Sequence, residues 1–371
     1  MNKETNTGGL DRFRLAAALL VTAIHTSPLT CVSPEADFFF TRVLARAAVP
    51  FFLMVTGQFV LPRVLEPGAR SGRRLLRYLV RTGLLYLGCI LLYLPLGIYA
   101  GHYQALTPGK ILRLLLWDGT FYHLWYFPAC MLGMTLLWLL SRRLGPRALA
   151  AACGALYLLG LSGDSYYGLT EYLPPLRSLC DLGFQLWSYT RNGLFLAPVF
   201  LLLGAHMGNL VHPQSSPGRP SCPGEKAGPA QTLPRTLPGK AALGAGLLLG
   251  LLGMTGEAFL LRHLDSLRHD SMYLFLLPVM YFLFSALLDT CTEERPKTFH
   301  KDLPLLIYRL HPLFIILVRG GAKLTKLSVF VDNSLAHYTA VAVSTFAGAL
   351  ILTKLLEMLK VTVHSVTNNT L

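Results

Sequence analysis

The sequence predicts an all-α fold, a polytopic membrane protein of about ten transmembrane helices with both termini in the cytoplasm. Of its 371 residues, 53% are hydrophobic and only 14% are charged, whereas about a quarter of the residues of a soluble domain are charged. Apolar runs of about 20 residues, long enough to cross a bilayer as a helix, recur along the whole chain. Basic residues collect in alternate loops between these runs, which fixes a common orientation.

Ten segments are expected to cross the membrane within a single domain, residues 1–371. They cover residues 14–31, 38–61, 75–99, 123–140, 147–162, 191–210, 241–261, 271–289, 303–320 and 336–359. A short interfacial helix is expected at 108–118, and a partial or re-entrant helix at 176–190. The segment 212–239, rich in Pro, Gly and Ser, is typical of a flexible cytoplasmic linker and separates six spans from four.

The orientation follows from loop charge. The loops after the second, fourth, sixth and eighth spans carry clusters of Arg and Lys, and in a ten-span arrangement all four lie on the side of both termini. The positive-inside rule makes that side the cytoplasm. The net charge of +14 therefore fits loops that face anionic lipid, and it gives no reason to expect nucleic acid. The seven cysteines form no CxxC pair, so no metal site is predicted.

The spacing of the ionisable residues in the first span places them on one helix face. Arg14 and His25 are eleven residues apart, which is about 20° past three full helical turns, so they share a helix face about 16 Å apart along the axis. Asp11 precedes Arg14 by three residues and falls on the same side. A neutral histidine with one partner can also sit in an apolar helix, so a structural role for His25 stays open beside a catalytic one.

Other polar residues lie within spans or at their ends, where such residues usually face a cavity or a partner. They are Arg42, Arg46, His123, Trp125, Arg191, Tyr308 and His311. Plainer explanations remain for several of them. Trp125 fits an interfacial aromatic belt and Arg42 can snorkel to the outer surface. His123 fits a solvated span end, and His311 before Pro312 fits a proline-adjusted helix start. In the second span, Thr56 and Gly57 permit close helix packing.

Arg73, Arg74 and Arg77 follow the second span. They are explained equally well as a stop signal for membrane insertion and as a phosphate site, since arginine forks bind phosphate oxygens and Arg74 and Arg77 would be neighbours on a helix face.

Together these residues resemble the acyltransferase-3 family of integral-membrane acyltransferases. The resemblance covers nearly the whole chain. Five family motifs occur in the family's order: Asp11 and Arg14 followed by His25, Phe51–Gly57 with Thr56 in place of serine, Arg74-x-x-Arg77, His123–Tyr126, and Tyr308-x-x-His311-Pro312.

A second similarity is to the membrane domain of the membrane-bound serine racemases of glycopeptide-resistance clusters. It is carried by Arg46–Phe52, Tyr122–Ala129, Gly163–Leu169 and Thr190–Phe195. Those bacterial racemases carry a cytoplasmic pyridoxal-phosphate domain after the last span. Because this chain ends at Leu371, shortly after the tenth span, we expect the racemase domain to be absent.

The family resemblance implies transfer of an acyl group, expected to be acetyl, from acyl-CoA to a hydroxyl or amine of a cell-envelope glycan or small metabolite in the inner (cell) membrane. Acyl-CoA would be a co-substrate, and no bound cofactor is expected. His25 would be the general base, with Arg14 and Asp11 orienting the cytoplasmic end, and Arg73, Arg74 and Arg77 would bind the CoA phosphates.

Six residues are expected to form the acceptor site, namely Arg46, His123, Trp125, Arg191, Tyr308 and His311. Two rival interpretations remain open at this point. The protein could be an amino-acid (serine) transporter or accessory membrane subunit, in which Arg46 and Arg191 bind a carboxylate and Asp164 binds an ammonium. It could also be a catalytically inactive scaffold.

Overall fold

A computed structural model describes residues 8–68, 70–104, 106–211, 238–290 and 299–369. The regular structure in the described part of the chain is all helical and includes no β-strand, as predicted. The predicted linker at 212–239 lies almost entirely outside the described residues, so its flexibility stays a prediction.

Helices occupy all ten predicted spans. The long elements are α1 (Gly8–Thr26), α3 (Ala48–Leu65), α4 (Arg70–Tyr99), α6 (Tyr126–Leu140), α7 (Pro146–Ser162), α9 (Ala197–Val211), α10 (Lys240–His263), α11 (Leu276–Asp289), α12 (Phe299–Thr325) and α14 (Ser334–Asn369). The short ones are α2 (Pro34–Phe38), η1 (Phe39–Val43), η2 (Leu44–Ala47), α5 (Pro108–Arg113), η3 (Leu114–Asp118), η4 (Gly168–Tyr172), α8 (Pro174–Gly183) and α13 (Val329–Asp332).

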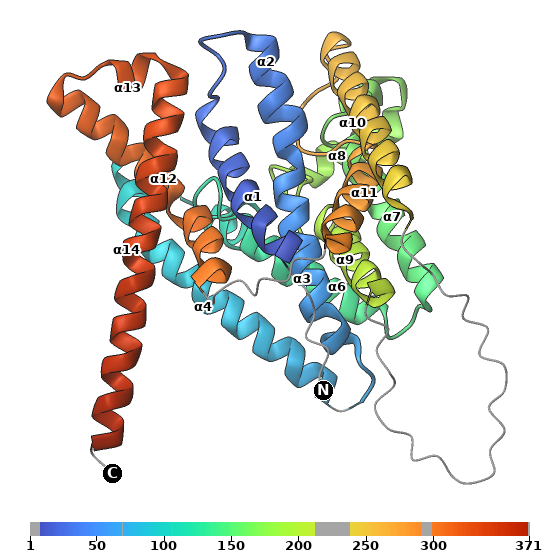
Figure 1. Ribbon diagram of the computed structural model, residues 1–371. Helices are drawn as coiled ribbons and strands as arrows, with labels where there is room; N and C mark the ends of the chain where they lie inside the picture. Colours follow the sequence, from blue (N-terminus) through green and yellow to red (C-terminus); the bar gives the residue numbers. More distant parts are fainter. Residues whose placement is uncertain (1–7, 69, 105, 212–237, 291–298, 370–371) are drawn as a thin grey trace.

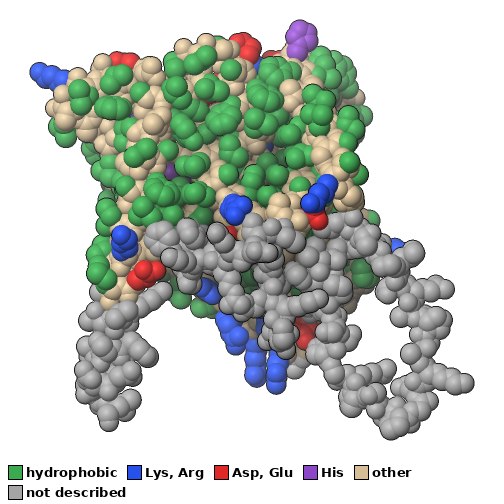
Figure 2. Space-filling model, in the orientation of Figure 1, with side chains coloured by type: hydrophobic (Ala, Val, Ile, Leu, Met, Phe, Trp, Pro, Cys, Tyr) green, Lys and Arg blue, Asp and Glu red, His purple; other side chains and the backbone are tan. Residues whose placement is uncertain are grey.

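Five described segments are long and apolar enough to cross a membrane, and four further apolar helices have 10–17 residues. The five are Pro34–Leu65, Arg70–Tyr99, Lys240–His263, Leu303–Thr325 and Ser334–Met358. The protein is therefore a multi-pass membrane protein, while the count of ten spans and the cytoplasmic termini stay predictions. In Figure 2, apolar side chains cover the middle of the visible face, and Lys and Arg gather at its lower edge.

Three of the predicted spans begin too early. The helices expected from residues 123, 191 and 271 begin only at Tyr126, Ala197 and Leu276, and turns or irregular backbone precede each of them. The first helix also ends at Thr26, before the predicted residue 31. Hydropathy averaged over a window of about 20 residues could not find these breaks, because each irregular stretch is only three to six residues long and mixes apolar residues with its polar ones.

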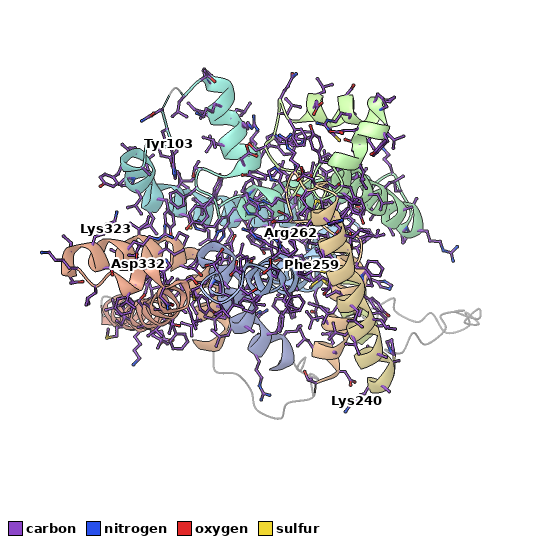
Figure 3. All side chains as sticks on the ribbon, turned by 90° about the horizontal axis from the view of Figure 1, so that it is seen from above. Tyr103, Lys240, Phe259, Arg262, Lys323 and Asp332 are labelled. Atoms are coloured by element: carbon purple, nitrogen blue, oxygen red, sulfur yellow. The ribbon has the colours of Figure 1, made fainter. Side chains whose placement is uncertain are left out.

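α1 and α3 form the centre of the molecule. α1 contacts α3, α11, α12 and α14, and α3 contacts α4, α6 and α9. Seen from above in Figure 3, both lie in the middle, with α12 and α14 on one side and α10 on the other. Of the most apolar window of Pro34–Leu65, 61% is buried, against 17% for α4, which crosses the lower part of the molecule obliquely (Figure 1). The second predicted span is thus a core helix.

The second span changes its helical geometry before α3 begins. Residues Phe39–Val43 form a π-helical turn and Leu44–Ala47 a 3₁₀ turn, an irregularity that is frequent at functional sites. Phe259 of α10 packs edge-on against Phe38 at 5.2 Å, and Arg262 stacks over the same ring at 4.6 Å. Figure 3 labels both side chains. α10 therefore supports the stretch that carries Arg42 and Arg46.

α3 and α9 touch backbone to backbone at two glycines. A Cβ atom at Gly57 would lie 2.0 Å from the carbonyl oxygen of Leu201, and one at Gly204 would lie 2.0 Å from that of Met54. Neither partner is a flexible side chain, so nothing can give way without moving a helix. The expectation that Gly57 permits close helix packing is confirmed by this contact.

Gly57→Ala should therefore separate α3 from α9 and lower the melting temperature in detergent, by the equivalent of about 1–3 kcal/mol for an overpacked core. Gly256→Ala in α10 is the matched control, because a Cβ atom there meets nothing within 4 Å. The control should be unchanged or slightly stabilised, since alanine is the better helix former. Equal melting temperatures for the two variants would contradict the contact.

Candidate functional site

Six of the predicted site residues line one cavity. They are His25, Arg46, His123, Trp125, Arg191 and Tyr308. The cavity has a volume of about 40 Å³, which holds one or two water molecules. A cavity of this size admits a functional group and not a whole substrate.

The cavity walls come largely from irregular backbone. His123 and Trp125 precede α6, Arg191 precedes α9, and Ser271 precedes α11, while Arg46 lies in η2. At membrane depth, irregular backbone is tolerated only where it is buried in protein or lines a cavity. The three late helix starts are thus part of the site.

Side chains satisfy the exposed backbone groups of these stretches. Oδ1 of Asp164 accepts hydrogen bonds from the backbone N–H of Ser271 at 2.7 Å and of Met272 at 2.9 Å. The Glu257 carboxylate accepts from those of Leu274 at 2.6 Å and Phe275 at 2.9 Å. Both carboxylates are buried. They replace the intrahelical partners that the start of a helix lacks.

The stretch before α9 is held in the same way from within. Oδ1 of Asn192 accepts from the backbone N–H of Leu194 at 2.9 Å and of Phe195 at 3.2 Å. Thr190 donates its hydroxyl to the carbonyl of Gly160 at 2.8 Å. Arg191, between these two anchors, is therefore carried on a fixed segment.

Three histidines meet beside the cavity. The His25 ring stacks on His311 with centroids 5.3 Å apart, and His123 meets the same ring edge-on at 5.4 Å. His123 and His311 are buried. The cluster joins α1, the stretch before α6, and α12, so the sequence motifs that carry these histidines converge in space. The described residues include no group of His, Cys, Asp and Glu arranged to hold a metal ion.

The tautomer of His311 is fixed by its neighbour in sequence. Its Nδ1 lies 2.8 Å from the carbonyl oxygen of Tyr308, and because a carbonyl only accepts, Nδ1 must carry the proton. Pro312 has no N–H, so it cannot bond the carbonyl four residues back, which is that of Tyr308. The proline frees the carbonyl that His311 uses. The Nε2 lone pair is left buried and without a partner.

Tyr308 ties the other end of the motif to His123. Its hydroxyl donates to the backbone carbonyl of His123 at 2.6 Å, which fixes the stretch before α6 against α12. Tyr93 of α4 donates to the carbonyl of Arg309 at 2.5 Å and packs edge-on against the His123 ring at 4.8 Å.

Arg46 and Arg42 share a carboxylate that the sequence analysis missed. Arg46 forms an ion pair with Asp270, and Nε of Arg42 lies 3.4 Å from Oδ2 of the same residue. Both arginines reach the same carboxylate, and Arg42 pairs there in place of snorkelling to the surface. Burial alone would raise the pKa of Asp270, but Arg46 and then Arg42 hold it below its usual value.

Arg191 has no such counter-charge. Its guanidinium lies 4.2 Å from the ring centre of Tyr189 and 5.2 Å from that of Trp125. NH1 donates to the Ser271 hydroxyl at 3.2 Å, while Nε is buried without a partner. In the described part of the chain, no carboxylate lies within ion-pair distance of it.

The structure does not bring Arg14 and Asp11 to the cavity. They form an ion pair with each other near the start of α1, and neither lines the cavity wall. His25 lies one residue before the upper end of the same helix (Figure 1). The two sites share a helix, as predicted, but remain separate in space.

The arginines after the second span lie at the lower start of α4 (Figure 1). Arg74 pairs with Glu66 and bonds the carbonyl of Arg63 at 2.9 Å. Arg73, Arg77 and Arg81 lie on one exposed face of α4 together with Leu76, Val80, Leu84 and Leu85. Arg77 lies three residues after Arg74 on this helix, as expected, although Glu66 engages Arg74. From Arg77, α4 leads to Tyr93 at the histidines, about 24 Å along its axis.

Residues 7–354 match the family described as an acyltransferase domain. The chain belongs to the acyltransferase-3 family. This confirms the resemblance drawn from the five motifs. No solved structure matches the chain.

The curated relatives of this acyltransferase-3 chain carry racemase names. Two amino-acid racemases of Enterococcus faecalis are 37% and 35% identical to it, over 95% and 97% of this chain and 47% of each relative. A serine/alanine racemase of Enterococcus gallinarum is 35% identical over 91% of this chain and 44% of its own length. The predicted relation to serine racemases is confirmed, and the chain spans about half the length of the curated relatives it matches.

The ionisation of Asp164 should leave a signature in the stability of the protein. Burial raises the pKa of Asp164 to about 6, so the fold favours its neutral form. That contribution is complete below the ordinary pKa of 3.8 and is lost as the pH rises through about 6, at a cost of about 3 kcal/mol. Asp164→Asn keeps an acceptor for both backbone N–H groups and removes the charge.

The melting temperature of Asp164→Asn in detergent should thus fall less than that of the wild type between pH values of about 4 and 7. His269 has the opposite sign, because burial and then Arg191 lower its pKa to about 4, but it is present in both proteins and cancels in the comparison. Parallel pH curves for the two proteins would show that Asp164 is ionised without penalty.

Pro312→Ala should loosen the tautomer of His311. The alanine restores a backbone N–H that competes for the Tyr308 carbonyl, so part of the His311 population should shift its proton to Nε2. Nitrogen-15 NMR of labelled histidine reports the tautomer directly. Pro304→Ala, in the same helix, is the control and should leave the His311 signals in place. A single unchanged tautomer in Pro312→Ala would refute the role given to the proline.

Proposed function

We propose that this membrane protein transfers an acyl group, expected to be acetyl, from acyl-CoA to a hydroxyl or amine of a cell-envelope glycan or small metabolite. The family supports acyl transfer in general. The observation that carries the finer proposal is the cavity in which His25 lies beside two further histidines and two arginines.

His25 is the proposed general base. It lines the cavity and stacks on His311, whose own proton is committed to the Tyr308 carbonyl. In the reaction, His25 takes the proton from the acceptor hydroxyl or amine, and the freed electron pair attacks the thioester carbonyl. The tetrahedral intermediate then collapses, the carbon–sulfur bond breaks, and the proton passes from the imidazolium to the departing thiolate. Acyl-acceptor and free CoA are the products, and atoms and charge balance.

The developing oxyanion needs a positive partner. Arg46 and Arg191 both line the cavity, and a cation fixed in a water-poor site stabilises such a charge more than water does. Arg46, which Asp270 holds in place, is the proposed partner of the oxyanion. A cavity of about 40 Å³ must widen to admit the two substrates.

The donor is proposed to bind at the start of α4. Arg73 and Arg77 are exposed there on one face of the helix and can hold the CoA phosphates. Arg74 can take part only if it exchanges Glu66 for a phosphate. The pantetheine arm would then follow α4 toward Tyr93, with the thioester at the histidines. Arg14 and Asp11, on the lower part of α1, are proposed to orient this donor-side end.

His25→Ala should abolish acyl transfer. Vesicles containing the wild-type protein are given radiolabelled acetyl-CoA on the side of the membrane where α4 begins. They should release free CoA thiol and retain the label in an acceptor of the host membrane. His25→Ala should lose this by about 10²–10⁴-fold, the usual contribution of a general base. His263→Ala removes an exposed histidine at the end of α10 and should be unaffected.

The same vesicles separate the transporter from the enzyme. The arginines in the cavity and the racemase names of the relatives keep amino-acid uptake as the rival function. Uptake of labelled L-serine that needs no acyl-CoA, together with no release of CoA thiol, would favour the transporter. Full transfer activity in His25→Ala would remove His25 from its proposed role.

A further inference from the structure

We propose that the cavity recognises an anionic acceptor, a small molecule or terminal group with a carboxylate or a phosphate beside its reacting hydroxyl or amine, and that Arg191 is the residue that binds the anion. This inference rests on the proposed function for the idea that an acceptor enters the cavity. It adds the chemical class of that acceptor.

The arginines around the cavity are not fully neutralised by carboxylates. Arg42 and Arg46 share Asp270, so one carboxylate already serves two cations. Asp164 acts on Arg191 only through its field, because its Oδ1 is occupied by two backbone N–H groups and its Oδ2 has no partner. The charged groups around the cavity therefore carry an excess of positive charge.

The contacts of Arg191 leave one edge of its guanidinium for an anion. Tyr189 and Trp125 lie against its guanidinium and Ser271 fixes NH1. Its Nε, on the edge of the guanidinium that can pair with a fork of two oxygens, is buried with no partner. A largely desolvated cation that has no paired carboxylate is costly at membrane depth. A planar carboxylate or a phosphate matches the guanidinium edge in a bidentate manner and would repay that cost.

The phosphates of the proposed donor lie far from Arg191. The phosphates of acyl-CoA are assigned to Arg73 and Arg77, about 30 and 24 Å from Tyr93 along α4, so they do not reach Arg191 while the thioester lies at the histidines. The cavity of about 40 Å³ has room for an anionic group but not for a nucleotide. The anion at Arg191 thus belongs to the acceptor.

The test uses the full-length protein in lipid nanodiscs without acyl-CoA, and binding is measured by calorimetry with two matched pairs of probes. Lactate is compared with propane-1,2-diol, and glycerol 3-phosphate with glycerol. Each pair keeps a hydroxyl and differs in the anion. At least one charged member should bind at least tenfold more tightly than its neutral partner. Preference for lactate identifies a carboxylate site, and preference for glycerol 3-phosphate identifies a phosphate site.

Arg191→Gln should lose this tenfold preference, and Arg191→Lys should keep part of it, because lysine retains the charge but not the fork. Arg143→Gln, which alters an exposed arginine after α6, should bind as the wild type does. Equal binding of charged and neutral probes by the wild type, or no binding of either anion, overturns the proposal even if the variants do not fold. Since no acyl-CoA is present, failure of acyl transfer would leave this result intact.

Discussion

Two buried carboxylates hold the architecture of the site. Asp164 and Glu257 together accept hydrogen bonds from four backbone N–H groups of the stretch 271–275. This stretch precedes α11 and is not helical. In a bilayer each of these groups would otherwise cost several kcal/mol. Because the carboxylates come from α10 and from the turn after α7, they also fix these elements around α11. The position of Ser271, and through it of Arg191, depends on this arrangement.

The same principle explains why polar residues concentrate where helices begin late. An irregular stretch exposes backbone groups, polar side chains must satisfy them, and the resulting polar environment can hold a buried cation or an imidazole. The stretches before α6, α9 and α11 supply His123, Arg191 and Ser271 to one cavity. η2 supplies Arg46 to the same cavity through another departure from regular α-helix, and Arg42 of η1 contacts the carboxylate that pairs with Arg46. The central α3–α9 contact, made by Gly57 and Gly204, gives these walls a rigid support.

Much of this was predictable from the sequence, for definable reasons. Ionisable residues in apolar spans are expensive, so His25, Arg46 and Arg191 had to face a cavity, and they do. Asp270 was missed because it lies outside the predicted span and more than 200 residues from its arginines. The late helix starts were missed because hydropathy cannot show that a side chain distant in the sequence, such as Asp164, accepts hydrogen bonds from irregular backbone. Arg74 and Arg77 lie on one helix, as their spacing predicted, but the spacing could not show that Glu66 pairs with Arg74.

The bond between His311 and the Tyr308 carbonyl constrains how this chain can change. Without the proline, the histidine competes with a backbone N–H for its acceptor. Without the histidine, the proline leaves a carbonyl unpaired in the interior of a membrane protein, which is unfavourable. Substitution at either position alone is therefore penalised, whereas replacing both restores an ordinary helical turn. His311 and Pro312 are therefore expected to be kept or replaced together.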